Sequence, residues 1–214
     1  MTQPSANCPN CGAQITFLWS GAVQTVCPFC RTVLVRHDVN LEKVGEAADL
    51  PVDSSPIQIR TEGKYKGRNF LVVGRILYEY ERGGWNEWHI IYSDGESGWL
   101  SDAQAEYAVS HAVPTPGNLP TPDKLHVGTT VEWNGSRYTV ATRTVAHYRG
   151  VEGELPFTTW DKKDVPFIDF RSESGRFATL DFSDPTPVLY LGEYVEWDDL
   201  KLANVREFEG WPLR

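Results

Sequence analysis

The four cysteines carry the clearest chemistry of the chain. They form two Cys-Pro-x-Cys pairs, Cys8 with Cys11 and Cys27 with Cys30, and fifteen residues separate the pairs. This spacing is typical of four-cysteine metal sites, in which two tight turns direct four thiolates at one cation. We predict a structural zinc site, because four protein ligands leave no coordination position for a substrate. The spacing leaves a single iron ion open as the alternative metal.

The stretch between the cysteine pairs predicts short strands rather than a helix. "AQITFLWSGAVQTV" contains two apolar segments joined by Ser20-Gly21, and "TVLV" follows the second pair. A redox dithiol would instead open a helix between two parallel strands. We therefore interpret residues 1–38 as a zinc ribbon, a hairpin bracketed by the two pairs. A unit of this size needs its metal to fold, and zinc binding supplies about 10–16 kcal/mol.

Composition argues against several classes of function. The 214 residues carry a net charge of −9, and residues 152–214 hold fourteen acidic against seven basic side chains. Because phosphate backbones are bound by lysines and arginines, we expect no general nucleic-acid binding. We expect neither a secretory leader nor a transmembrane segment, since no apolar run is long enough. Cysteines used as metal ligands indicate a reducing compartment, so the expected location is cytoplasmic.

The chain beyond the cysteines repeats itself. "IQIRTEGKYKGRNFLVVGRILYEY" (residues 57–80) aligns without a gap on "LHVGTTVEWNGSRYTVATRTVAHY" (residues 125–148), at a constant offset of 68. Each copy continues with alternating apolar and polar residues broken by Gly-containing turns, which indicates further short strands. The sequence therefore predicts an all-β protein, an N-terminal four-cysteine zinc ribbon followed by two tandem small β-barrels of SH3-like form.

Composition shifts place the boundaries of these units. The predicted organisation is a ribbon over 1–38, a polar linker over 39–56 with a turn of helix near its middle, a first β-barrel over 57–113, a proline-rich spacer over 114–124, and a second β-barrel with a C-terminal extension over 125–214. The second copy carries extra residues, 149–164, which we predict to form a surface loop.

Large aromatic side chains are the candidate interaction residues. They are Trp85, Trp88, Phe157 and Trp160, and the last two stand in the insertion that breaks the repeat. Aromatic grooves of small barrels bind extended peptides, although small β domains also use large rings to fill their cores. No catalytic residue is predicted, because the chain has neither a Gly-rich phosphate loop before a helix nor a Gly-x-Ser-x-Gly turn.

The segments "GRNFLVVGRILYEYERGGWNEWHIIYSDGESGWL" and "LYLGEYVEWDDLKLANVREFEGW", with the ribbon before them, resemble a bacterial domain-of-unknown-function family. The resemblance covers nearly the whole chain from Ile57 onward. It implies a cytoplasmic β protein that often bears a zinc ribbon. The resemblance further implies genes beside those for a spermidine-synthase-like aminopropyltransferase and for small membrane proteins, and it assigns no catalytic residue.

Three functions follow as hypotheses. The first is a non-enzymatic protein-binding or scaffold module with an unidentified protein partner, which the implied gene neighbours place in a membrane-associated or envelope-stress assembly. The second is a small-molecule-binding protein or an enzyme, with its site between the two barrels near His89 or Trp160. The third is nucleic-acid binding by the ribbon together with the basic side chains Arg60, Lys64, Lys66, Arg68 and Arg75.

Overall fold

The computed structural model describes residues 4–37, 40–51, 54–117, 119–133, 135–158 and 163–208, which are almost entirely β. The strands are β1 (Ser5–Asn7), β2 (Gln14–Thr16), β3 (Gln24–Val26), β4 (Thr32–His37), β5 (Asn40–Glu46), β6 (Glu62–Tyr65), β7 (Arg68–Tyr80), β8 (Gly83–Tyr92), β9 (Ser97–Ala103), β10 (Glu106–Val113), β11 (Thr130–Trp133), β12 (Ser136–Leu155), β13 (Val165–Arg171), β14 (Arg176–Asp181) and β15 (Val188–Val195). Two short 3-10 turns, η1 (Pro122–Lys124) and η2 (Trp197–Leu200), complete the described elements. The predicted all-β class is confirmed.

The N-terminal unit contains two hairpins instead of one. Strand β1 pairs with β2, and β3 pairs with β4, all antiparallel. Each cysteine pair therefore lies in the turn of its own hairpin, and the prediction of a single hairpin bracketed by the two pairs is wrong. The physical reason is local, because each Cys-Pro-x-Cys turn already reverses the chain and brings its own flanking strands together.

Part of the predicted linker is a strand. Residues Asn40–Glu46 form β5, which pairs antiparallel with β4 from His37↔Asn40 to Thr32↔Glu46. Leu41 packs against the cluster that contains the cysteines, so this polar segment contributes one apolar side chain to a very small core. The connection from the ribbon to the first repeat is correspondingly shorter than 39–56, and no helical turn occurs in its described part.

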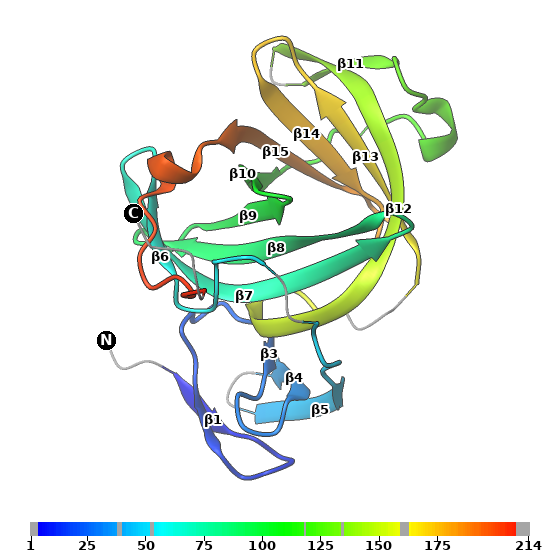
Figure 1. The fold of residues 1–214 in the computed structure, drawn as a ribbon. Helices are drawn as coiled ribbons and strands as arrows, with labels where there is room; N and C mark the ends of the chain where they lie inside the picture. The colour runs from blue at the N-terminus through cyan, green and yellow to red at the C-terminus, as the bar shows by residue number, and fades with distance from the viewer. Residues whose placement is uncertain are drawn as a thin grey trace.

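Eight strands form a closed ring, so the two repeats share one sheet instead of closing separately. The ring runs β7-β8-β9-β10-β15-β14-β13-β12 and returns to β7, with every neighbouring pair antiparallel. Strand β6 extends the first repeat beside β7, and β11 extends the second beside β12. Figure 1 shows the first repeat, the second repeat above it and the ribbon below.

Strand β12 joins the three parts of the molecule. Its twenty residues pair with β13, then with β7, and finally with β3 of the ribbon through Glu154↔Thr25 and Leu155↔Gln24. The predicted insertion loop 149–164 is therefore a strand as far as Leu155. Val151 and Leu155 are buried in the core between the repeats, which explains why this segment pairs instead of looping out.

The offset of 68 residues holds in the hydrogen bonds of the two repeats. The Arg60 amide donates to the Val72 carbonyl, and 68 residues later the Gly128 amide donates to the Val140 carbonyl. The bulge that follows Val72 in β7 recurs after Val140 in β12. Each repeat also has its own core on the outer face of the ring, centred on Trp88 and Phe170 respectively.

Replacing Gly74 with alanine tests how closely β7 approaches β12. A Cβ atom at this position would lie 2.0 Å from the Glu154 carbonyl oxygen, so the two strands would have to separate. We expect a decrease of roughly 1–3 kcal/mol in the free energy of unfolding, the usual effect of overpacking, measured by urea denaturation. Gly117→Ala is the matched control, since an added methyl meets nothing within 4 Å. Equal effects of the two substitutions would contradict this close approach.

Candidate metal centre and barrel lumen

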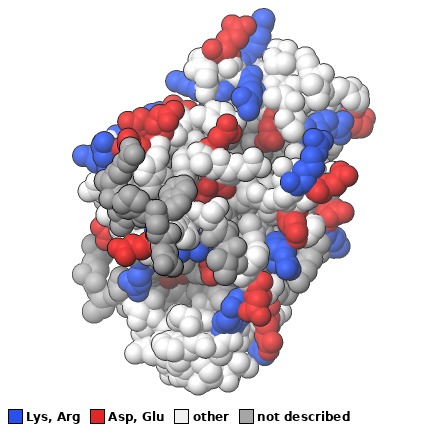
Figure 2. All heavy atoms as spheres, viewed as in Figure 1, with Lys and Arg blue, Asp and Glu red and all other residues white. Residues whose placement is uncertain are grey.

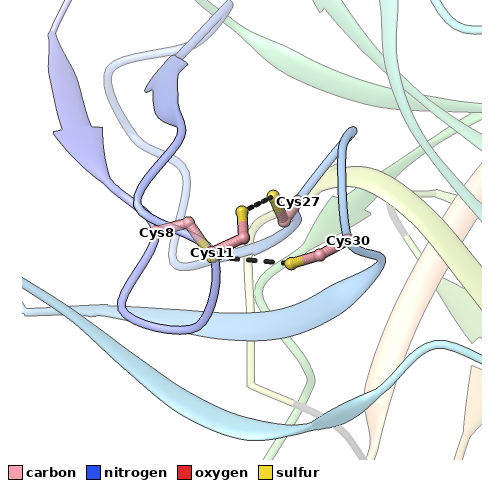
Figure 3. A group of neighbouring side chains, drawn as sticks. All are labelled: Cys8, Cys11, Cys27 and Cys30. Atoms are coloured by element: carbon pink, nitrogen blue, oxygen red, sulfur yellow. Dashed lines mark hydrogen bonds between the residues drawn. The ribbon is translucent and has the colours of Figure 1, made fainter.

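The four cysteines meet at one point between the two N-terminal hairpins (Figure 3). Their sulfur atoms all lie within 4.8 Å of one another. The Sγ atoms of Cys8 and Cys30 are 3.7 Å apart, and those of Cys11 and Cys27 are 3.8 Å apart. A tetrahedral ion with sulfur ligands at ~2.3 Å requires sulfur atoms about 3.8 Å apart. The donor set therefore fits a tetrahedral metal ion, and the four cysteines are confirmed as a cluster that can hold one.

The two turns that supply the thiols have the same backbone pattern. The Gly12 amide donates to the Cys8 carbonyl, and the Arg31 amide donates to the Cys27 carbonyl, both at 2.8–2.9 Å. Gly12 and Arg31 both adopt left-handed backbone conformations, with φ of 77° and 59°. Side-chain contacts hold Arg31 in this conformation, since its guanidinium bonds the Ala48 carbonyl and pairs with a carboxylate of the same segment.

The surroundings of Cys30 favour its thiolate, the form that binds metals. The Thr32 hydroxyl lies 3.2 Å from the Cys30 sulfur, and this contact is the main cause that lowers the pKa of the thiol to about 5. Cys8 and Cys27 are buried, whereas Cys11 is exposed. The cluster thus stands at the surface of its own small unit.

Glu154 fastens this unit to the barrel. Its carboxylate accepts hydrogen bonds from the backbone amides of Leu18 (2.6 Å) and Trp19 (2.9 Å). Burial raises the pKa of Glu154, and the two amide bonds oppose this rise. The interaction satisfies two partly buried amide donors of the ribbon loop with one side chain of β12, at the point where β12 pairs with β3.

His89 is part of the same junction and has a structural role. Its Nδ1 lies 2.9 Å from the Glu154 carbonyl oxygen and its Nε2 lies 2.8 Å from the Ser97 hydroxyl, so both ring nitrogens are bonded. Burial lowers the pKa of His89 to about 4, which keeps the imidazole neutral near pH 7. The Trp19 ring packs edge-on against the imidazole, and Trp99 packs on it from the barrel side.

The interior of the ring contains a cavity of about 1160 Å³ lined by residues of both repeats. Exposed lining residues such as Arg82 and Arg143 mark its mouth, whereas Trp99 and Ser110 are buried at its inner end. We call this cavity the lumen. The lumen lies between the two repeats, where the sequence hypothesis expects a site, but His89 is not among its lining residues.

Three of the carboxyl groups that line the lumen are buried or partly buried, whereas the other lining acids are exposed. Glu87 on β8 accepts hydrogen bonds from the Trp85 indole (2.9 Å) and the Ser101 hydroxyl (2.8 Å). Asp169 accepts from a threonine hydroxyl of β14 at 2.8 Å, and Asp181 accepts from the amide and hydroxyl of Ser183. Burial raises the pKa of all three groups, that of Glu87 to about 7.

The predicted interaction aromatics that the structure describes fall in two different environments. Trp85 and Phe157 line the lumen, where Phe157 stacks on Trp99 at 5.9 Å. Trp88 points to the opposite face of β8 and has no exposed surface, so it serves the outer core instead of a partner. Trp160 lies outside the described residues.

The basic side chains proposed for nucleic-acid binding are largely paired. Lys66 pairs with Glu193 at 2.8 Å, Arg68 forms a two-pronged bond with Asp94, and Arg75 is buried. Figure 2 shows acidic and basic side chains interspersed over this face of the molecule. These contacts leave the nucleic-acid hypothesis without a continuous basic surface on this face.

A family model described as "Domain of unknown function (DUF4178)" matches residues 58–197. The chain belongs to this family. The DUF4178 match covers every strand of the ring together with β6 and β11, and the metal unit precedes it. No curated protein and no solved structure matches the chain.

In the described part of the chain, no helix has the length and apolar character needed to cross a membrane.

Sequence analysis missed Asp169 and Asp181 as lumen residues of the DUF4178 domain. Both interrupt apolar strand segments, "PFIDFR" and "FATLDF", and aspartate is depleted in strands. That unfavourable placement was the available signal. It was not decisive, because an outward-facing aspartate on a half-exposed strand produces the same alternation.

Removing the metal should unfold the ribbon and leave the ring intact. The apolar side chains that pack with the cysteines in the described residues are Ile15, Leu34 and Leu41, whereas each repeat has a separate core. After chelation, hydrogen-exchange mass spectrometry should detect loss of amide protection in β3–β5 and retained protection in β13 and β14. Unchanged protection in β4, or equal loss in β13, would contradict a metal-dependent ribbon on an independent ring.

Proposed function

We propose that this chain is a non-enzymatic binding protein that holds a small ligand in the lumen. The observation that carries the proposal is the cavity of about 1160 Å³, to which both repeats contribute. Close packing normally leaves few voids larger than a water molecule inside a protein. An eight-stranded barrel either fills its interior with side chains or reserves it for one small ligand. This volume belongs to the second case, since ligand pockets typically measure ~300–1,000 Å³.

The lining supports binding by its mixture of apolar and polar groups. Aromatic rings of Trp85, Phe167 and Tyr190 provide apolar contact, while Glu87 and Ser101 provide fixed polar atoms. Ligand sites generally combine a mainly apolar wall with a few well-placed polar groups. Alignment of the two repeats around one cavity also explains why the family match covers the whole ring.

The metal unit has a structural role in this proposal, and zinc is the metal we propose. Four thiolates with tetrahedral spacing favour zinc or a single iron, and they leave no open coordination position. Metal analysis of purified protein should find about one zinc ion per chain. Iron in the site would colour the protein, whereas zinc would not, because zinc has a filled d shell.

Thiolate ligands also support the proposed cytoplasmic location, because thiols stay reduced in that compartment.

Filling the lumen should abolish binding of an uncharged probe. The dye N-phenyl-1-naphthylamine fluoresces more strongly in apolar sites, so titration of the protein with it measures access to the lumen. Ala108→Phe and, independently, Ser110→Phe place a ring in the cavity, and we expect about a tenfold or greater loss of affinity. Val127→Phe is the matched control, because Val127 is exposed outside the lumen. Binding that is unchanged in both filled variants would contradict the proposal.

Protein docking through the ribbon is a second candidate function, and one observation favours it. Phe29 stands at the tip of the second cysteine turn and is 69% exposed, the most exposed large apolar side chain of the described residues. A rigid turn that presents an aromatic ring to solvent is typical of a protein contact. This site fits the protein partner that the sequence predicts, and it does not require the aromatics of the lumen.

A photo-reactive amino acid at position 29 tests this second candidate. We expect it to form one discrete crosslinked species in cells, and the same amino acid at position 127, which is equally exposed, should form none. Phe29→Ser should prevent recovery of that species by an affinity-tagged chain. Identical crosslinking from both positions would indicate non-specific contact and would contradict docking through the ribbon.

A further inference from the structure

We infer that the ligand of the lumen is an organic cation, an ammonium group attached to an apolar body. This inference rests on the proposed function, because it assigns a chemical class to the ligand of the same cavity. It is carried by the arrangement of carboxylates, basic groups and aromatic rings around one cavity of about 1160 Å³.

The carboxylates stand on opposite walls of the lumen. Glu87 belongs to β8 of the first repeat, whereas Asp169 and Asp181 belong to β13 and β14 of the second. Asp169 lies opposite Thr179 in the β13–β14 register, so Asp181 is its diagonal neighbour on the same face. The remaining exposed surface of Glu87 and Asp169 opens into the cavity. A ligand in the lumen therefore meets carboxyl oxygens from two sides.

Hydrogen bonds hold these carboxyl groups without neutralising them. Glu87 accepts from an indole and a hydroxyl, and Asp169 and Asp181 accept from hydroxyl and amide groups, all of them uncharged donors. Among the described lining residues, the arginines are all exposed at the mouth; they are Arg82, Arg143 and Arg171. Burial raises the pKa of Asp169, and the charge of Arg171 opposes this rise only in part. The interior therefore holds acidic groups with no basic side chain among their hydrogen-bond donors, and a bound cation would favour their ionised form.

Aromatic rings adjoin the same carboxylates. The Trp85 ring stacks on Tyr78, with centroids 4.9 Å apart and planes 15° from parallel, and its indole N–H points at Glu87. Tyr190 lines the facing wall, and its place opposite Thr179 in the β14–β15 register makes it a diagonal neighbour of Asp181. An ammonium group next to a carboxylate and over an aromatic face gains from both the charge and the ring quadrupole. A ligand carboxylate or phosphate would instead be repelled by all three acids.

An isosteric series of probes separates charge from shape. The probes are 4-phenylbutylammonium, 4-phenylbutan-1-ol and 4-phenylbutanoate, each titrated against the full-length protein by displacement of N-phenyl-1-naphthylamine. We expect the ammonium to bind about tenfold or more tightly than the alcohol, and the carboxylate to bind most weakly. The shared phenylbutyl body keeps the apolar contribution constant across the series.

Glu87→Gln identifies the responsible group. The substitution preserves the shape of the side chain, so the fold should persist, and it should reduce ammonium affinity about tenfold while changing alcohol affinity less than twofold. Glu132→Gln, at an exposed position of β11, is the matched control and should change neither affinity. Asp181→Asn provides an independent second variant with the same expected pattern.

Ammonium binding should also strengthen as pH rises. The pKa of Glu87 is about 7 because of burial and the charges of Asp169 and Asp181, and the other titratable groups coupled to it are Tyr78 and Tyr190. The cation binds the ionised carboxylate, and the amine stays protonated in this range. Affinity for the ammonium should therefore be about tenfold lower at pH 6 than at pH 8, while affinity for the alcohol stays constant.

The outcomes distinguish this inference from the proposed function. Dye binding that depends on an unfilled lumen, together with equal affinities for ammonium and alcohol, would overturn the cation assignment and leave the lumen as a ligand site. Tighter binding of the carboxylate would also overturn it. Absence of dye binding to the unmodified protein would overturn the proposed function itself, and the cation assignment with it.

Discussion

The antiparallel pairing of β12 with β7 is the interaction on which the rest of the structure depends. Without it, the eight strands would form one open sheet in which only β10 and β15 join the two repeats, and no closed lumen would form between them. In this pairing the backbones of β12 and β7 approach so closely that side chains would collide. Gly74 and Gly153, which face each other, permit the approach because they have no Cβ atom. The pairing also carries a charge pair at the surface of the wall, since the buried Arg75 bonds to Asn86 and pairs with the partly exposed Glu152 on β12. Ring closure is therefore encoded by a few small and charged residues in an otherwise apolar wall.

The metal unit and the lumen are connected through a continuous set of contacts. Glu154 bonds the ribbon amides with its carboxylate and His89 with its carbonyl. The imidazole in turn contacts Trp19 of the ribbon and Trp99, whose other neighbour is Phe157 in the lumen. A buried neutral histidine bonded at both nitrogens is a rigid spacer, because it has no alternative partner to turn to. The ribbon thus supports the inner end of the cavity.

Local features of the sequence predicted local features of the structure. The cysteine spacing predicted the metal cluster, and the offset of 68 matched hydrogen bonds and a bulge in both repeats. The pairing between the repeats could not be predicted, because it joins strands about 75 residues apart and depends on which edges are free. Polar segments were also misassigned: Asn40–Glu46 and the first part of 149–164 form strands through partners supplied by the tertiary structure. Acidic residues facing a cavity have no local pattern of their own.

The strand order places β5 and β6 at the two ends of the sheet, and β11 is a further edge strand beside β12. Strand β6 is partly covered, because Glu62 exchanges backbone hydrogen bonds with Ala203 of the C-terminal segment. Strand β5 carries Glu42, Lys43 and Glu46 on its short exposed edge. Charged edges resist pairing with strands of other molecules. The ribbon strands β3, β4 and β5 continue the sheet beyond the end of β12, so the edge strand on this side is the charged β5. This arrangement disfavours pairing of the sheet with strands of a second molecule.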